Sequence, residues 1–299
     1  MVGGQKSASG VAQREGFVFN INDRSVLGEE WCSMYSTATP VKFGKCHFEA
    51  AMMNLIREPN INSSAILRAD ILREVVFEMN EDSNTVVKEE KSQDLEITDG
   101  EAKKLGIDDL EVRFPPIDPE LNLHVISQAV RRVIPRNPYK DAIMNQTCLV
   151  MNGSSQTPAP SSLIVYTPHI QAEDDCPFYI PRVKTVGILF HNKTLSVHYI
   201  PFDNLELLQD ESQRVVRTAW RLLQTAYKHS MGIMEGYEKR VNHDQVVDKV
   251  GFQDRYIILK KKYSKFLVDN WAESTDPKKH VFEDIAIAAF LIELWRKIY

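Results

Sequence analysis

The sequence is poor in the residues that build metal sites and disulfide frameworks. Its four cysteines are widely spaced and no two form a CxxC pair: Cys32, Cys46, Cys148 and Cys176. Such spacing argues against a zinc site and a disulfide-stapled fold, and it is typical of reduced thiols in the cytosol. His191 and His198 have no third ligand nearby in the sequence, so we expect no metal site.

The sequence also lacks a leader peptide and a membrane-spanning run. Residues 1–10 contain glycine and serine but no apolar core, so they do not resemble a signal or transit peptide. The apolar stretch near the carboxyl end is too short and too flanked by charge to cross a bilayer. A hydrophobic fraction of 43% and a charged fraction of 26% are typical of a soluble globular protein. We therefore expect a cytoplasmic protein without a membrane partner.

Glycine is present but scattered. None of the 13 glycines belongs to a Gly-x-Gly-x-Gly turn after a strand. A doubly wound fold uses such a turn to bring its backbone close to a nucleotide cofactor. The sequence therefore contains no recognisable cofactor turn of this kind.

Positive charge is unevenly distributed. Residues 212–299 carry 16 Lys and Arg against 11 Asp and Glu, whereas residues 1–211 carry 20 against 30. A basic end on an acidic body suggests an anionic partner at that end, and the alternative is a salt-bridged helical surface. In the acidic body, Arg131, Arg132, Arg136 and Lys140 form a basic cluster, for which a structural role is favoured over contact with RNA phosphates.

The first two thirds of the chain have the pattern of an α+β domain, which we place at residues 17–205 after a disordered start at 1–16. Short β-rich segments and one short helix are predicted there: strands at 17–21, 69–79, 110–114, 142–151 and 163–166, and a helix at 48–57. Segment 121–133 is ambiguous. Residues 183–190 and 195–200 alternate around a tight polar turn and predict a β-hairpin. The acidic stretch at about 80–109 predicts a mobile loop.

The remainder, residues 206–299, predicts a helical region. Apolar residues at three- and four-residue spacing predict helices over 213–227 and 253–271. Thr275-Asp276-Pro277 predicts the start of a last helix, because a capping side chain precedes a proline at the first helical position. That helix is apolar nearly all round, which predicts burial by neighbours. The overall fold class is α+β: a mixed, mostly antiparallel sheet region followed by a helical region.

Two stretches of this helical region are candidate RNA contacts. Residues 228–244 read as a polar, glycine-punctuated connection with basic groups for phosphates and an aromatic ring for stacking, and the alternative is an ordinary helix–helix loop. Two lysines in the first turn of the last helix oppose its dipole, which suggests that a partner uses them, and the alternative is two solvated lysines. With Arg255 and Lys260 from the helix over 253–271 added, the candidate RNA-binding residues are Lys228, Tyr237, Lys239, Arg240, His243, Arg255, Lys260, Lys278 and Lys279.

Three strings in this region point to a known family: KHSMGIMEGYEKRVNHD (228–244), FQDRYIILKKKYSKFLVDNW (252–271) and STDPKKHVFEDIAIAAFLIELW (274–295). They resemble the fungal tRNA(Ser) uridine-44 2′-O-methyltransferase family. FYIPRVKTVGILF and LSVHYIPFD, within 178–203, are similar to it as well. The resemblance covers about residues 178–299, and little before Phe178 is family-specific.

The resemblance implies a tRNA (uracil-O(2)-)-methyltransferase that uses S-adenosylmethionine, with tRNA(Ser) and not DNA as partner. In the family, the last apolar helix leads into a Rossmann-type methyltransferase domain, which is expected next and is absent from this chain. We therefore expect an incomplete form that is inactive alone, with no catalytic residue identifiable. Glu283 and Asp284 could lie beside the cofactor, or could be capping carboxylates. The alternative function is a non-catalytic tRNA-binding or protein-interaction fragment.

Overall fold

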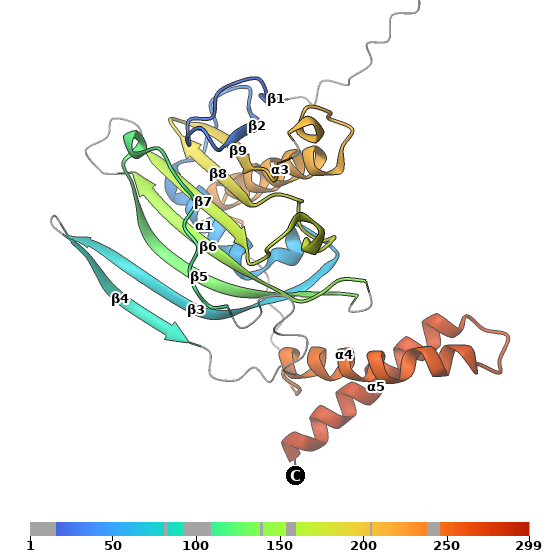
Figure 1. Ribbon diagram of the computed structural model, residues 1–299. Helices are drawn as coiled ribbons and strands as arrows, with labels where there is room; N and C mark the ends of the chain where they lie inside the picture. Colours follow the sequence, from blue (N-terminus) through green and yellow to red (C-terminus); the bar gives the residue numbers. More distant parts are fainter. Residues whose placement is uncertain are drawn as a thin grey trace, which may run out of the picture. The chain divides into compact units, whose positions relative to one another are not determined.

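The computed structural model describes residues 16–80, 83–91, 109–137, 140–153, 160–203, 205–237 and 246–298. These residues belong to two compact units. The first comprises residues 1–136 and 141–237, and the second comprises residues 238–299 with the short segment 137–140. The first unit is a sheet with helices, and the second is a pair of helices (Figure 1).

The first unit is built on a nine-stranded sheet in which every neighbouring pair of strands is antiparallel. The strands follow the order β1-β2-β9-β8-β7-β6-β5-β3-β4 across the sheet. Their bounds are β1 Phe17–Phe19, β2 Cys32–Thr37, β3 Ile66–Asn80, β4 Ser83–Lys91, β5 Leu123–Pro135, β6 Met144–Gly153, β7 Ser161–Pro168, β8 Thr185–His191 and β9 Thr194–Ile200. The α+β class with an antiparallel sheet is thus confirmed.

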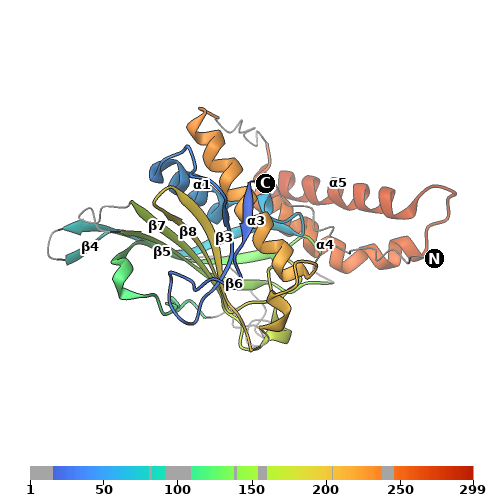
Figure 2. The same ribbon diagram turned by 90° about the horizontal axis from the view of Figure 1, so that it is seen from above.

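One face of this sheet is covered by two helices, α1 (Lys45–Arg57) and α3 (Arg214–Met234), which Figure 2 shows on the same side of the strands. Alternate strand residues pack with both helices in one buried apolar cluster. Representative members are Phe48 and Met52 from α1, Val216, Ala219 and Leu223 from α3, and Ile164, Ile188, Phe190 and Tyr199 from the strands.

The opposite face is covered by extended chain. Leu149, Leu163 and Leu189 form a second buried cluster with Trp31, and Ile117 packs against its edge. The Trp31 indole donates a hydrogen bond of 2.7 Å to the carbonyl of Pro116, which holds the segment around Pro116 and Ile117 against this face. Because both faces are covered, the central strands β6 to β9 are buried along nearly their whole length instead of at alternate residues.

Gly187 in β8 is required by this second layer. A Cβ at that position would lie 2.9 Å from Cζ3 of Trp31 and 3.1 Å from Cδ1 of Leu27. Both neighbours are buried, so we expect Gly187→Ala to lower the free energy of unfolding by about 1–3 kcal/mol through overpacking. Urea denaturation followed by circular dichroism measures this loss.

Gly232 in α3 provides the matched control. A Cβ there meets Tyr237 at 3.6 Å, an ordinary contact distance. Gly232→Ala should therefore stabilise the helix by about 0.5–1 kcal/mol, because alanine has less backbone entropy to lose. Equal effects from the two substitutions would contradict the role given to Gly187.

Several elements of this unit differ from the prediction, among them β2 (Cys32–Thr37), for which no strand was predicted. Residues 83–91, predicted to be mobile loop, form strand β4, which pairs with β3; residues 81–82 and 92–108 lie outside the described residues. Residues 110–114 are extended but form no strand. The ambiguous segment 121–133 is strand β5. The predicted hairpin is confirmed as β8 and β9, with Asn192 and Lys193 at φ values of 45° and 63° in its turn.

Helix α3 is longer than predicted and belongs to the sheet unit. It continues to Met234 through the stretch expected to be a polar connection. Ser230 is fully buried there, and its hydroxyl donates to the Ala226 carbonyl at 2.7 Å. The hydroxyl is therefore satisfied within the helix, and the helix continues past it. The compact unit extends to Tyr237, whereas the sequence placed a boundary at 205. The difference arises because the apolar face of α3 is part of the sheet core.

The second unit is a hairpin of α4 (Lys249–Asp269) and α5 (Pro277–Ile298). Asp248 caps α4 by accepting from the Gly251 N–H at 2.8 Å. Asp276 accepts from the Lys278 N–H at 2.9 Å, which confirms the predicted start of α5.

Helix α5 is not buried on every side within the described residues. Its buried side chains are Val281, Ile285 and Ala289, whereas Ile287 and Trp295 are 58% and 56% exposed. Only the stripe that faces α4 is covered within the described residues, so the predicted burial by neighbours is met on one side of α5.

Candidate nucleic-acid interface

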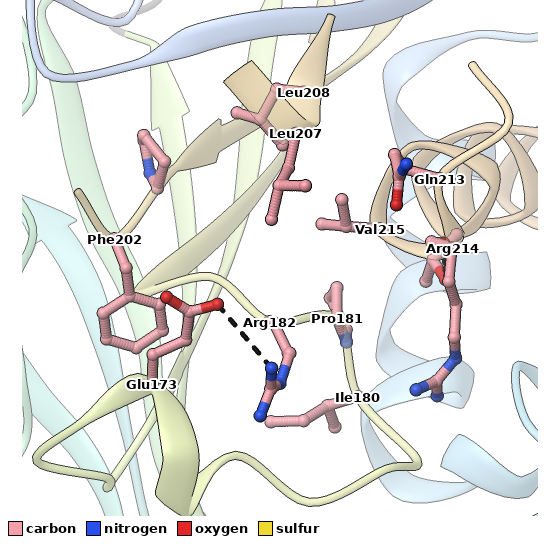
Figure 3. A pocket seen from close by; sticks show the side chains of 12 residues that line it. Glu173, Ile180, Pro181, Arg182, Phe202, Leu207, Leu208, Gln213, Arg214 and Val215 are labelled. Atoms are coloured by element: carbon pink, nitrogen blue, oxygen red, sulfur yellow. Dashed lines mark hydrogen bonds and ion pairs between the residues drawn. The ribbon is translucent and has the colours of Figure 1, made fainter. Parts of the chain in front are cut away.

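A cavity of about 190 Å³ lies in the first unit where the end of β9 approaches the first turns of α3 (Figure 3). Its walls are mostly apolar, with the ring of Phe202 on one side. The lining residues include Arg182, Phe202, Leu207, Gln213 and Val215, with Glu173 at the edge. An apolar hollow with a few polar groups at its edge is the usual form of a small-ligand site.

Polar groups of both kinds meet at this cavity. The Arg182 guanidinium lies 3.9 Å from the Glu173 carboxylate and 3.4 Å from that of Asp174. Gln213 donates its amide N–H to Asp210 at 3.0 Å, which leaves its amide oxygen as an acceptor. Figure 3 shows Arg182, Val215 and Leu207 around the same hollow. A ligand in the cavity therefore meets both hydrogen-bond donors and acceptors.

Cations lie against aromatic rings beside the cavity. The Arg214 guanidinium is 3.4 Å from the ring centre of Phe178, a ring that is 64% exposed. The Lys184 ammonium is 5.9 Å from the ring centre of Phe202. Burial lowers the pKa of Arg214 from its ordinary value, without removing its charge. Cations interleaved with aromatic rings are the combination that single-stranded RNA binds.

Sequence reasoning did not select these residues. Phe178, Arg182 and Lys184 belong to the string FYIPRVK, which was used only as a sign of family membership. The available signal was a pair of basic residues two positions apart beside an aromatic residue and a proline. These residues lie beside α3 only in the folded chain, so their sequence neighbours give no sign of this contact.

The structure places the predicted RNA-binding residues of the first unit at the end of α3. Lys228 is exposed on the helix. Tyr237, 68% exposed, follows a helix end in which Gly236 has a φ of +80° and the Tyr237 N–H donates to the Gly232 carbonyl at 2.8 Å. Lys239, Arg240 and His243 lie outside the described residues.

Two of the four basic candidates in the hairpin are engaged within it. The Arg255 guanidinium bonds the Glu293 carboxylate at 2.8 Å, and this pair links α4 to α5. The Lys260 ammonium lies 4.6 Å from the ring centre of Phe282. Both residues therefore hold the two helices together, so their role as RNA contacts stays an untested prediction.

The other candidates in the hairpin are solvent-accessible. Lys278 and Lys279 are exposed in the first turn of α5. Glu283 and Asp284 are also exposed, and the Glu283 carboxylate is 3.8 Å from the His280 ring nitrogen. Near the same turn, the rings of Trp271 and His280 stack with centres 5.8 Å apart. The turn thus combines two exposed lysines with a stacked aromatic pair that the sequence did not suggest.

The arginine cluster of the acidic body is structural at its centre. Arg131 and Arg132 are each 5% exposed. Arg131 donates to the side-chain oxygen of Gln146 at 2.7 Å and to the carbonyls of Leu55 and Ile56 at the end of α1. A buried guanidinium that caps a helix in this way cannot reach RNA phosphates.

Asp109 with the buried His169 and Thr147 has the residue types of a nucleophilic triad but not its access. The His169 ring bonds the Thr147 hydroxyl at 2.7 Å and the Asp109 carbonyl at 3.0 Å, and Thr147 is fully buried. Burial, and then the Arg113 charge, lower the pKa of His169, which keeps the ring neutral. These hydrogen bonds hold the chain at Asp109 against Thr147 in strand β6.

The histidines first considered as metal ligands bond to serines instead. His191 bonds the Ser161 hydroxyl at 2.8 Å, and His198 bonds Ser25 and Ser196 at 2.9 and 2.8 Å. Among the described residues, no group of three His, Cys, Asp or Glu side chains could hold a metal ion. None of the helices in the described part combines the length and apolarity that a bilayer span requires.

The described residues also do not form a site for S-adenosylmethionine. A doubly wound cofactor site needs a strand, a glycine-rich turn and a helix in succession. In the second unit, the described residues 246–298 form two helices and their connection, with no strand. We therefore assign no chemical step to these residues.

The first unit is thus an antiparallel sheet packed on the long helix α3. Residues 11–240 match the family model described as "TRM44-like, N-terminal bet v1-like domain". This match covers most of the chain, and the chain belongs to the TRM44-like family. Residues 246–299 match a second family model, described as "Predicted AdoMet-dependent methyltransferase".

Curated relatives agree with this assignment. The tRNA (uracil-O(2)-)-methyltransferase of Saccharomyces cerevisiae is 60% identical over 293 residues, which are 96% of this chain and 52% of that protein. The Kluyveromyces lactis protein of the same name is 61% identical over 94% of this chain and 52% of its own length. The Schizosaccharomyces pombe protein is 38% identical over 84% and 45%.

The chain thus spans about half the length of the curated relatives it matches. No solved structure matches it. The predicted resemblance is confirmed, and it extends well before Phe178, where little of the sequence had been recognised.

Proposed function

We propose that this chain is part of an S-adenosylmethionine-dependent tRNA (uracil-O(2)-)-methyltransferase that methylates uridine 44 of tRNA(Ser). The observation that carries the proposal is identity of about 60% over nearly the whole chain with proteins of that enzyme name. The second family match, over residues 246–299, supports the cofactor. The tRNA species, the exclusion of DNA and the cytoplasmic location rest on the resemblance alone.

Within this enzyme, we assign the two units different tasks. The bet v1-like domain and the exposed lysines of the hairpin turn bind the tRNA substrate. The hairpin of α4 and α5 begins the methyltransferase domain, and exposed apolar residues of α5, among them Ile287 and Trp295, pack on the sheet of that domain. Apolar surface of this kind on a helix favours burial against another element. Glu283 and Asp284, exposed on the same helix, stay candidates for the edge of the cofactor pocket.

The test measures binding and methyl transfer together. The 299-residue chain is titrated with tRNA(Ser) and with a control tRNA over a salt series, and incorporation of labelled methyl groups is assayed in the same samples. We expect binding that weakens steeply with salt, because lysine–phosphate contacts release counterions. We expect no methyl transfer by these residues alone, and methylation at uridine 44 by the longer protein.

Charge reversal of Lys278 and Lys279 tests the hairpin turn. The double variant should lower the slope of log affinity against log salt by about 1 to 2, since two phosphate contacts are lost. Lys42→Glu, on an exposed position of the sheet unit, is the matched control and should leave the slope unchanged. An unchanged slope in the double variant would remove the turn from the interface.

A second candidate function is a non-catalytic tRNA-binding or protein-interaction fragment. The observation that favours it is that the described residues contain no strand followed by a glycine-rich turn and a helix, the arrangement that would hold the cofactor. Binding of tRNA without methylation by the longer protein would support this candidate over the enzyme.

A further inference from the structure

The cavity beside Phe202 has the size of a site for one ring system. Its volume of about 190 Å³ lies below the range of roughly 300–1,000 Å³ that is typical of pockets for drug-sized ligands. Its walls come from Ile180 and Pro181 before β8, from Leu207 and from Val215 in α3. Figure 3 shows the side chains of Leu207, Val215 and Pro181 converging on the hollow. A flat, largely apolar group fits such walls better than a charged one.

The edge of the cavity bears a hydrogen-bonding pattern that an apolar ligand would leave unpaired. Arg182 supplies donors, and Glu173 and the Gln213 amide oxygen supply acceptors. A nucleobase carries N–H donors and acceptor atoms around a flat ring, so it can satisfy both kinds of group while its face stacks on an aromatic side chain. An aliphatic or phenylalanine side chain of a protein partner would satisfy neither.

The charges around the cavity suit the phosphates on either side of such a base. Arg182 and Lys184 are both exposed. The carboxylate partners of Arg182 hold it weakly, because Asp174 is 98% exposed and Glu173 is 3.9 Å away. Arg182 can therefore exchange these partners for a phosphate at low cost.

We propose that this cavity takes one unpaired nucleobase of an RNA partner, with the base stacked on Phe202 and an adjacent phosphate on Arg182. The inference rests on the proposed function, because it names where the bet v1-like domain holds the RNA. A free nucleotide shares this chemistry, and the experiment separates the two sources. The site is distinct from the end of α3 and from the hairpin turn.

The first test maps contacts in the unaltered chain. The 299-residue chain is irradiated with a short single-stranded RNA of mixed sequence that contains thiouridine, and the cross-linked peptides are identified by mass spectrometry. We expect cross-links within 173–184 or 201–218. A large excess of mixed nucleoside monophosphates should compete only weakly, because a free nucleotide lacks the neighbouring phosphates.

The second test separates stacking from phosphate contact in two variants. Phe202→Leu keeps an apolar side chain but removes the aromatic face, and it should weaken RNA binding by about five- to thirtyfold without changing the salt slope. Arg182→Gln should weaken binding and lower the slope by about 0.7, the value for one phosphate contact of a single strand. Lys42→Gln, exposed and away from the cavity, is the control and should bind as the parent does. Circular dichroism confirms that all three variants are folded.

The possible outcomes distinguish a failure of this inference from a failure of the proposed function. Cross-links in the stated segments and the two different salt responses support the inference. RNA binding with cross-links elsewhere and unchanged affinity in both variants overturns the inference and leaves the proposed function standing. Complete competition by nucleoside monophosphates assigns the cavity to a free nucleotide and overturns the RNA proposal. The absence of any RNA binding by the chain overturns both.

Discussion

Replacement of Arg131 by methionine is expected to lower the free energy of unfolding of the sheet unit by about 3–5 kcal/mol, because three buried acceptor oxygens lose their donor. The Arg131 guanidinium donates to Gln146 at 2.7 Å and to the Leu55 and Ile56 carbonyls, and it lies 5.0 Å from the ring centre of Tyr166. Methionine fills much of the same volume but donates no hydrogen bond. The oxygen atoms at the end of α1 would then be buried without partners, which costs about 1–3 kcal/mol each.

The measurement is urea denaturation followed by circular dichroism and tryptophan fluorescence. Arg136→Met is the matched control, because Arg136 is exposed at the end of the same run and its side chain should matter by less than about 0.5 kcal/mol. The double variant Arg131→Met with Gln146→Leu should recover part of the loss, since one orphaned oxygen is removed. A loss below about 1 kcal/mol in Arg131→Met would contradict a capping role.

Acidification is expected to destabilise the sheet unit through His198. Burial lowers the pKa of His198 to about 4, and its ring bonds two serine hydroxyls at 2.9 and 2.8 Å. The unfolded state takes up the proton at about pH 6.5, before the folded state can, so stability falls as the pH drops through this window. The contribution of this one group between pH 7 and pH 5 is about 2 kcal/mol, and its full value below pH 4 is about 3 kcal/mol.

The test compares the free energy of unfolding that the parent and its variants lose between pH 7 and pH 5. His198→Gln retains a donor and an acceptor for the two serines but does not titrate. Whatever its stability at pH 7, the variant should lose about 2 kcal/mol less than the parent between pH 7 and pH 5. His124→Gln, at a partly exposed position of β5, should lose as much as the parent. Equal losses in His198→Gln and the parent would show that another group controls the acid response.

Local pattern was enough to predict the elements whose signal lies within a few residues. The β8–β9 hairpin is predicted because its two segments alternate around a tight polar turn, and the start of α5 is predicted because a capping side chain precedes Pro277. The same reasoning failed for β4. Its charged, serine-containing sequence suggests a loop, and it becomes a strand because β3 offers an edge to pair with.

The candidate site was less accessible to sequence reasoning. The sequence singles out basic residues, but charge alone does not say which of them are engaged within the chain. Arg131 is buried as a helix cap and Arg255 is paired across the hairpin, whereas Lys278 and Lys279 are exposed. The cavity beside Phe202 was not predicted, because its walls come from segments more than thirty residues apart, from Ile180 to Val215.

The sequence by itself determined the class of the fold, the antiparallel hairpin, the helical carboxyl-terminal part and the family, since propensity, turn chemistry and long matching strings are all local properties. The tertiary structure alone decided that α3 belongs to the sheet core, that Gly187 must leave room for Trp31, and that Arg131 caps a helix. It also decided which apolar residues of α5 are covered. Burial and pairing depend on neighbours that are distant in the chain, so a local pattern can suggest which residues are available for a partner but cannot tell which of them remain free.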